Sequence, residues 1–256
     1  MNSWVLAGVS FVAMFGGCLF AIFVARRLAE HHVSKETQDT VKLGVGMVAA
    51  MSSLILGLMT ASVKENFDST DKDVHTYALN VLSLATDLRH YGPEACPAQD
   101  LLAQYVHSVL TETWGLGHYG ETKPEPGSDQ LLLSLDNTIR NWTPTTDLLK
   151  ETRTAAMSDM RSILTTRWAV SEEAVASVPT AFLVVLVAWL ALIFISFGLF
   201  APPNAVVIVS FFLCAASISG ALFLIMEMSG PFEGIIAVQP QPMEQVLDFI
   251  KVSRCK

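Results

Sequence analysis

The chain has 256 residues, of which 52% are hydrophobic and only 16% are charged. Soluble domains average about 25% charged residues, so this composition argues against a soluble enzyme and excludes a disordered chain. The net charge is −8, and residues 64–176 account for all of it with 17 acidic and 9 basic residues. A block this acidic is not expected to bind nucleic acid.

Four stretches without a charged residue reach the length of about 20 residues with which a helix crosses a bilayer. They cover residues 4–25, 43–63, 178–200 and 205–226. Runs this long and continuous predict helices, because a helix satisfies its own backbone hydrogen bonds in lipid. The sequence therefore predicts an all-α membrane protein with four transmembrane helices, arranged as two hairpins at 1–63 and 178–227.

The loop between the first two stretches is basic. It carries Arg26, Arg27, Lys35 and Lys42, whereas the N-terminal tail has no charged side chain. Basic residues beside transmembrane helices stay on the cytoplasmic side of the membrane. We therefore expect a multi-pass protein of the cell membrane whose two termini and residues 64–177 lie on the non-cytoplasmic side.

Residues 64–177 form an acidic insert that is expected to be helical. One long helix is predicted from about residue 38 to residue 91, since apolar residues continue at spacings of three and four beyond the second apolar stretch until Gly92. Further helices are expected from Pro97 to Gly115, over 129–142, and from Thr145 or Thr146 towards the third transmembrane helix. No segment alternates in the way that a strand would.

Residues 228–256 form a C-terminal tail with an amphipathic segment. Pro242 opens a short helix that places Met243, Val246, Leu247 and Ile250 on one face. A helix of this kind is expected to lie at the membrane interface or to pack on the insert.

The sequence carries no convincing catalytic, cofactor-binding or metal-binding motif. Gly115, Gly117 and Gly120 match GxGxxG, but they follow a predicted helix, whereas the nucleotide motif follows a strand. A flexible loop is the better interpretation. We therefore expect neither an enzyme nor a cofactor.

The four cysteines fall into two pairs by position. Cys18 and Cys214 lie inside predicted transmembrane helices, where buried thiols are ordinary. Cys96 and Cys255 lie outside them and, by the topology above, on the same side. If that side is oxidising the two could pair, so they form a candidate disulfide.

The second apolar stretch carries small residues at helical spacing. We call them the small-residue stripe: Gly46, Ala50, Ser53, Gly57, Thr60 and Ala61. Small residues let helices pack closely, and they also leave room beside a narrow path where Ser or Thr can coordinate ions. Taken alone the stripe favours helix packing and leaves a pore-lining role open. Leu56 lies off the stripe and is expected to face lipid.

Six segments carry a resemblance to a known family. They are RRLAEHHVSK (26–35), LILGLMTAS (54–62), YGPEA (91–95), SFGLFAPPN (196–204), FLIME (223–227) and PFEGII (231–236). Over most of its length the chain resembles the bacterial bestrophin-like membrane proteins, long catalogued as a domain of unknown function.

The resemblance implies a function. Bestrophins proper are oligomeric anion channels whose second transmembrane helix lines the pore, which implies a homo-oligomer of the bacterial inner membrane that conducts an inorganic ion past the stripe. Two features depart from that pattern. Bestrophins place their insert in the cytoplasm, and an acidic insert repels anions near a pore mouth. The alternative is a non-conducting membrane scaffold or sensor whose insert binds a protein partner.

Overall fold

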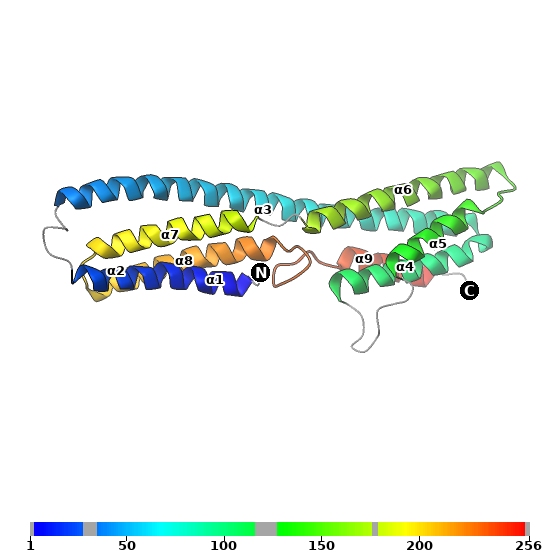
Figure 1. The fold of residues 1–256 in the computed structure, drawn as a ribbon. Helices are drawn as coiled ribbons and strands as arrows, with labels where there is room; N and C mark the ends of the chain where they lie inside the picture. Colours follow the sequence, from blue (N-terminus) through cyan, green and yellow to red (C-terminus); the bar gives the residue numbers. More distant parts are fainter. Residues whose placement is uncertain (1–2, 28–34, 116–126, 176–178, 254–256) are drawn as a thin grey trace. The chain divides into compact units, whose positions relative to one another are not determined.

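A computed structural model describes residues 3–27, 35–115, 127–175 and 179–253. These residues form helices joined by short connections, and no strand occurs among them (Figure 1). The chain divides into two compact units. Unit 1 comprises Met1–Asn66 and Ser177–Gly230, and unit 2 comprises Phe67–Ala176 and Pro231–Lys256.

Unit 1 contains the most apolar helices. They are α1 (Ser3–Phe11), a π-helical turn (Val12–Gly16), α2 (Gly17–Ala25), the first part of α3 (Lys35–Tyr91), α7 (Thr180–Phe200) and α8 (Ala205–Met228). Four helices in the described part of the chain are long and apolar enough to cross a membrane. They are the stretch Ser3–Ala25, α3, α7 and α8. These helices contain the apolar stretches 4–25, 43–63 and 205–226. The stretch 178–200 matches α7 from Thr180 onwards, and residue 178 lies outside the described residues.

Close packing of α2 against α7 forms the centre of unit 1. A Cβ atom on Gly198 would lie 2.5 Å from the carbonyl oxygen of Cys18 and 3.1 Å from the Cβ of Ala21. Only glycine therefore allows this approach of the two helices. The core around it is buried and apolar, and comprises Met14, Cys18, Ile22, Leu186, Leu190, Phe194, Ala215 and Leu222.

The turn between α7 and α8 follows from local chemistry. Pro202 and Pro203 cannot continue α7, because proline lacks the backbone N–H that a helix interior needs. Asn204 then caps α8, since its side-chain oxygen accepts a hydrogen bond of 2.9 Å from the backbone N–H of Val207.

Unit 2 is a helical bundle with one apolar core. It contains the rest of α3, a 3₁₀ turn (Pro93–Ala95), α4 (Cys96–Trp114), α5 (Ser128–Arg140), α6 (Asp147–Val175) and α9 (Gln241–Ser253). All five helices contribute buried residues. Among them are Leu84 and Leu88 of α3, Leu102 and Tyr105 of α4, Leu135 of α5, Met160 of α6 and Met243 of α9.

Glycine ends two of these helices. Gly92 after α3 and Gly115 after α4 have φ angles of 97° and 63°, in the left-handed region that glycine adopts without a steric penalty. The predicted ends of both helices lie at these glycines. By contrast α5 ends at Arg140, two residues before the predicted end. Trp142 instead leaves the helix and stacks on Tyr91 with 3.9 Å between ring centroids.

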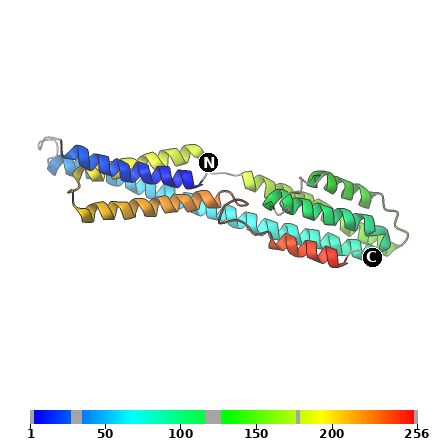
Figure 2. The same cartoon turned by 90° about the horizontal axis from the view of Figure 1, so that it is seen from below.

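The C-terminal tail packs inside unit 2. Trp114 of α4 donates a hydrogen bond of 2.8 Å from its indole N–H to the carbonyl of Val238, and its ring lies 5.3 Å from that of Phe232. Met243 and Ile250 of α9 are buried in the bundle core. Figure 2 shows α9 alongside α3. The amphipathic face of the tail therefore contacts the insert, which is one of the two locations that its sequence allows.

Candidate functional site

The small-residue stripe lies on an exposed face of α3. All six of its residues are exposed in the described structure. A Cβ atom on Gly46 or on Gly57 would meet nothing within 4 Å. Gly198 in the same unit is buried against α2, so the two kinds of glycine have different roles.

A different face of α3 contacts the rest of unit 1. Ser52 and Val63 are buried, and Leu56 and Met59 pack against the core. Each residue of an α-helix is rotated by about 100° from the one before it, so the six stripe residues fall within an arc of about 100° around the helix axis. The four core-facing side chains lie outside this arc. Leu56 therefore contacts protein, and the expectation that it faces lipid is wrong, because α3 turns this side to the core. The stripe is left without a partner among the described residues of its own chain.

Charged residues flank the stripe at both ends. Lys42 precedes the stripe and Lys64 follows it, and both point in the same direction from the helix axis as the stripe does. Asp39 and Asp68 lie about one helical turn further from the stripe along α3, one at each end. All four side chains are exposed. An ion that approached the stripe along this face would pass a carboxylate and then an ammonium group.

The stripe also presents hydroxyl groups. The Thr60 hydroxyl donates a hydrogen bond of 2.8 Å to the Leu56 carbonyl, so its oxygen remains available as an acceptor. Ser53 lies two turns away on the same face. These oxygens are the only side-chain polar atoms that the six residues offer.

The cysteines differ in state. Cys96 is disulfide-bonded, whereas Cys18 is free and buried and Cys214 is free and exposed. Cys255 lies outside the described residues. The pairing of Cys96 with Cys255 stays a prediction.

A polar network joins four helices of unit 2. Arg167 of α6 donates hydrogen bonds to the Tyr105 hydroxyl (3.3 Å) and to the Ser128 hydroxyl (2.9 Å). It also forms an ion pair of 2.7 Å with Asp129. Tyr105 is fully buried and its hydroxyl bonds that of Tyr77. The residues come from positions 77 to 167, so no local pattern in the sequence indicates the network.

Burial and hydrogen bonding fix the charges in this network. Burial raises the pKa values of Tyr77 and Tyr105, so both phenols are neutral at pH 7. Desolvation opposes ionisation of Glu112, but hydrogen bonds from Ser128 and Ser108 outweigh it and lower the pKa of that carboxyl. Glu112 is therefore ionised and holds the first turn of α5 to α4. The arrangement is a structural cross-link between helices.

The remaining motifs bring no further chemistry together. No group of three or more His, Cys, Asp or Glu side chains that could hold a metal ion occurs within the described ranges. The segment that matches GxGxxG lies outside the described residues after Gly115.

Comparisons with known proteins address the family. The profile of the Bestrophin-like domain matches residues 12–243. No curated protein sequence matches the chain.

Solved structures with the same fold are also found. A variant of a bacterial bestrophin homologue from Klebsiella pneumoniae has a TM-score of 0.68 at 12% identity, covering 97% of this chain and 98% of that one. A second variant of this homologue has a TM-score of 0.67 at 13% identity, covering 96% and 98%. A crystal structure described as a membrane protein has a TM-score of 0.64 at 13% identity, covering 92% and 96%.

The family match and the structural likeness cover nearly the same residues. The likeness shows a shared fold along almost the whole of both chains, and the profile extends from the first apolar helix to the start of α9. Both agree with the six segments that carry the resemblance in the sequence. The chain belongs to the Bestrophin-like family.

Proposed function

We propose that the protein is an oligomeric, channel-like membrane protein in which the small-residue stripe of α3 faces a central path for an inorganic ion, and that it is not an enzyme. The observation that carries this proposal is the exposure of the stripe without a partner among the described residues of its own chain. Small residues on a membrane helix serve close helix contacts or leave room for a path. In either case the stripe needs a second copy of the chain.

The stripe supports a path because of its chemistry and its place in the family fold. Ser53 and Thr60 offer hydroxyl oxygens, and Gly46 and Gly57 leave space beside them. Structures with this fold come from bacterial bestrophin homologues, and bestrophins proper are channels. The rival function is a scaffold in which copies pack through the same face and no ion passes.

The test is accessibility of Ser53→Cys to a water-soluble thiol reagent in liposomes. The background lacks Cys18 and Cys214, so that neither of these two free native thiols can contribute to the labelling. If residue 53 faces a water-filled path, the reagent is expected to modify the introduced thiol, and the ion flux is expected to change as the thiol reacts. Leu58→Cys is the matched control: this residue is 63% exposed on α3 away from the stripe, so its thiol should face lipid and stay unmodified.

Gly57→Leu separates the two functions in the same assay. A Cβ atom at this position meets nothing within 4 Å in its own chain, so each copy is expected to fold normally. If the stripe lines a path, Gly57→Leu should block ion flux while the oligomers persist. If the stripe only packs helices together, Gly57→Leu should reduce the yield of oligomer, and the unmodified protein should show no flux. Leu58→Phe serves as the mild control. Unchanged assembly and flux in Gly57→Leu would exclude both roles.

We further propose that the insert and both termini lie on the non-cytoplasmic side. The basic residues of the loop between α2 and α3 support this orientation. The disulfide at Cys96 supports it independently, because disulfides persist in oxidising compartments. Cys18 and Cys214 are free, which supports Cys255 as the partner of Cys96.

A reporter fusion tests the orientation. Alkaline phosphatase joined after residue 120 is expected to be active, since the enzyme matures only outside the cytoplasm, and a reporter that requires the cytoplasm should be silent at the same site. The same pair of reporters after residue 30 should give the reverse result. An active cytoplasmic reporter after residue 120 would place the insert in the cytoplasm, as in bestrophins proper.

A further inference from the structure

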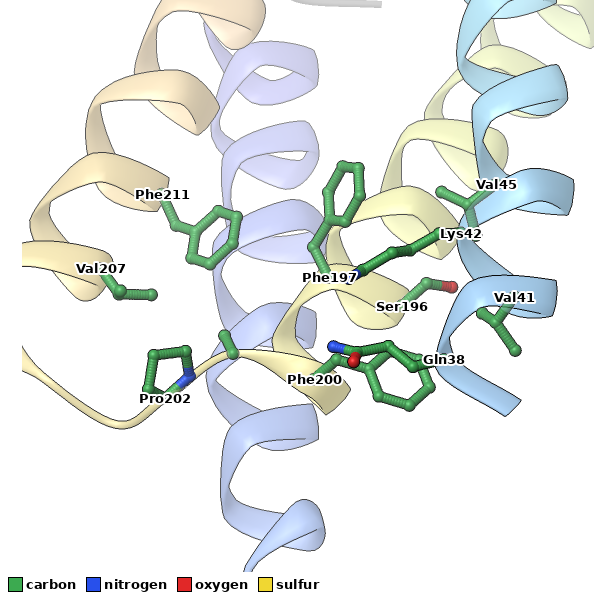
Figure 3. Close-up of a pocket in the computed structure, with 11 residues that line it drawn as sticks. Gln38, Val41, Lys42, Val45, Ser196, Phe197, Phe200, Pro202, Val207 and Phe211 are labelled. Carbon is green, nitrogen blue, oxygen red and sulfur yellow. The ribbon is translucent and has the colours of Figure 1, made fainter. Parts of the chain in front are cut away.

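A cavity of about 440 Å³ opens in unit 1 between three helices (Figure 3). Gln38 and Lys42 line it from the start of α3, Ser196 and Phe197 from the end of α7, and Val207 from the start of α8. The volume lies in the range of about 300–1,000 Å³ that small-molecule sites occupy.

The cavity has one cation and no acid among the described residues that line it. Lys42 forms no ion pair or hydrogen bond with any described residue, and neither does the side-chain amide of Gln38. Figure 3 shows both side chains reaching from α3 towards α7. Two hydrogen-bond donors, one of them charged, are therefore available to a ligand in the cavity.

The rest of the wall is apolar. It consists mainly of valine, phenylalanine and proline side chains, namely Val41, Val45, Phe197, Phe200, Pro202, Val207 and Phe211. The Ser196 hydroxyl donates to the carbonyl of Leu192 at 2.8 Å, so that group is already bonded within α7. A ligand that matches this surface has a long apolar body and a negatively charged end.

The position of the cavity indicates where such a ligand comes from. Residues 201–204 join α7 to α8 in a short turn, so the end of one helix and the start of the other lie at the same membrane surface. Ala201 and Pro202 of this turn line the cavity, so in a membrane that α7 and α8 cross the cavity would lie at the depth of the lipid headgroups. The acyl chains of the membrane lipids are present at high concentration beside the apolar wall of the cavity.

We propose that the cavity binds an anionic phospholipid, with its phosphate at Lys42 and Gln38 and an acyl chain along Phe197 and Val207. Basic pockets between membrane helices bind acidic lipid headgroups by the same physics. Arg26 and Arg27 directly follow α2 and add positive charge at this end of the unit, because α2 and α7 run in the same direction: Gly17 lies beside Ile195, and Cys18 and Ala21 lie beside Gly198. The lipid would contact α3 one turn from Gly46. The proposal does not depend on ion conduction.

Native mass spectrometry of the purified full chain tests this site. Phosphatidylglycerol and phosphatidylcholine with identical acyl chains compete for the protein, so that only the headgroup charge differs. A basic side chain near the headgroup favours the anionic lipid by about five-fold. Lys42→Gln is expected to remove that preference, and Lys72→Gln, an exposed lysine of α3 in unit 2, is expected to retain it.

A second variant tests the apolar part. Val207→Trp fills the cavity and should reduce binding of both lipids, while gel filtration verifies that the variant remains folded. An unchanged preference in Lys42→Gln, or unchanged occupancy in Val207→Trp, would overturn the proposal. Displacement of phosphatidylglycerol by inorganic phosphate at equal concentration would identify a soluble anion as the ligand and also overturn it.

Discussion

Replacing Gly198 by valine is expected to prevent unit 1 from folding. The first added carbon would lie 2.5 Å from the carbonyl oxygen of Cys18, and the two further methyl groups have no space between α7 and α2. The contact is with backbone, so a rotamer change cannot relieve it. Overpacking of this kind costs about 3 kcal/mol or more. The measurement is the yield of protein in the folded gel-filtration peak after detergent extraction, which should fall several-fold.

Gly8→Val is the matched control for this substitution. Gly8 is also a helical glycine of unit 1, but a Cβ atom there meets nothing within 4 Å. Both variants carry the same change in helix propensity, so a difference between them reports the packing of α2 on α7. Equal yields of the two variants would contradict this packing.

Replacing Arg167 by alanine is expected to weaken unit 2. The change removes hydrogen bonds to Tyr105 and Ser128, and both partners lie inside the bundle. Loss of the charged partner of two buried hydroxyl groups costs about 2–4 kcal/mol. Hydrogen exchange of protected amides in α4, measured on the full chain, should accelerate by roughly 30- to 700-fold. The acceleration should extend across the bundle, because Arg167 joins α6 to α4 and α5.

Arg140→Ala provides the control. Arg140 also forms an ion pair, at 2.6 Å with Asp136, but its side chain is 54% exposed and both residues belong to α5. An exposed pair within one helix contributes little to stability. Exchange in α4 should stay at the rate of the unmodified protein. Similar acceleration in both variants would show that Arg167 has no special role in joining the helices.

Patterns in the sequence were sufficient to predict the features of this protein that depend only on neighbouring residues, such as the apolar helices and the ends of two helices. A run of about 20 apolar residues is long enough to cross a bilayer whatever lies beside it, so the four apolar helices can be recognised from the sequence. Helix ends at Gly92 and Gly115 could be predicted because a left-handed φ angle depends on the residue itself. The six segments that resemble the bestrophin-like proteins likewise indicated the family, which the profile over residues 12–243 establishes.

Only the tertiary structure decided how each side chain is used. Gly57 and Gly198 are both glycines in apolar helices, and no neighbouring residue distinguishes them, yet Gly57 is open to the surroundings and Gly198 touches the backbone of α2. Leu56 contacts the core because α3 turns that face to unit 1. Arg167 meets Tyr105 through the packing of separate helices. The sequence by itself determines which helices form, because the hydrogen bonds and the length of a helix depend on residues that are close together in the chain. Which face of each helix makes contacts depends on the shapes of all the helices that pack together, and only the tertiary structure shows this.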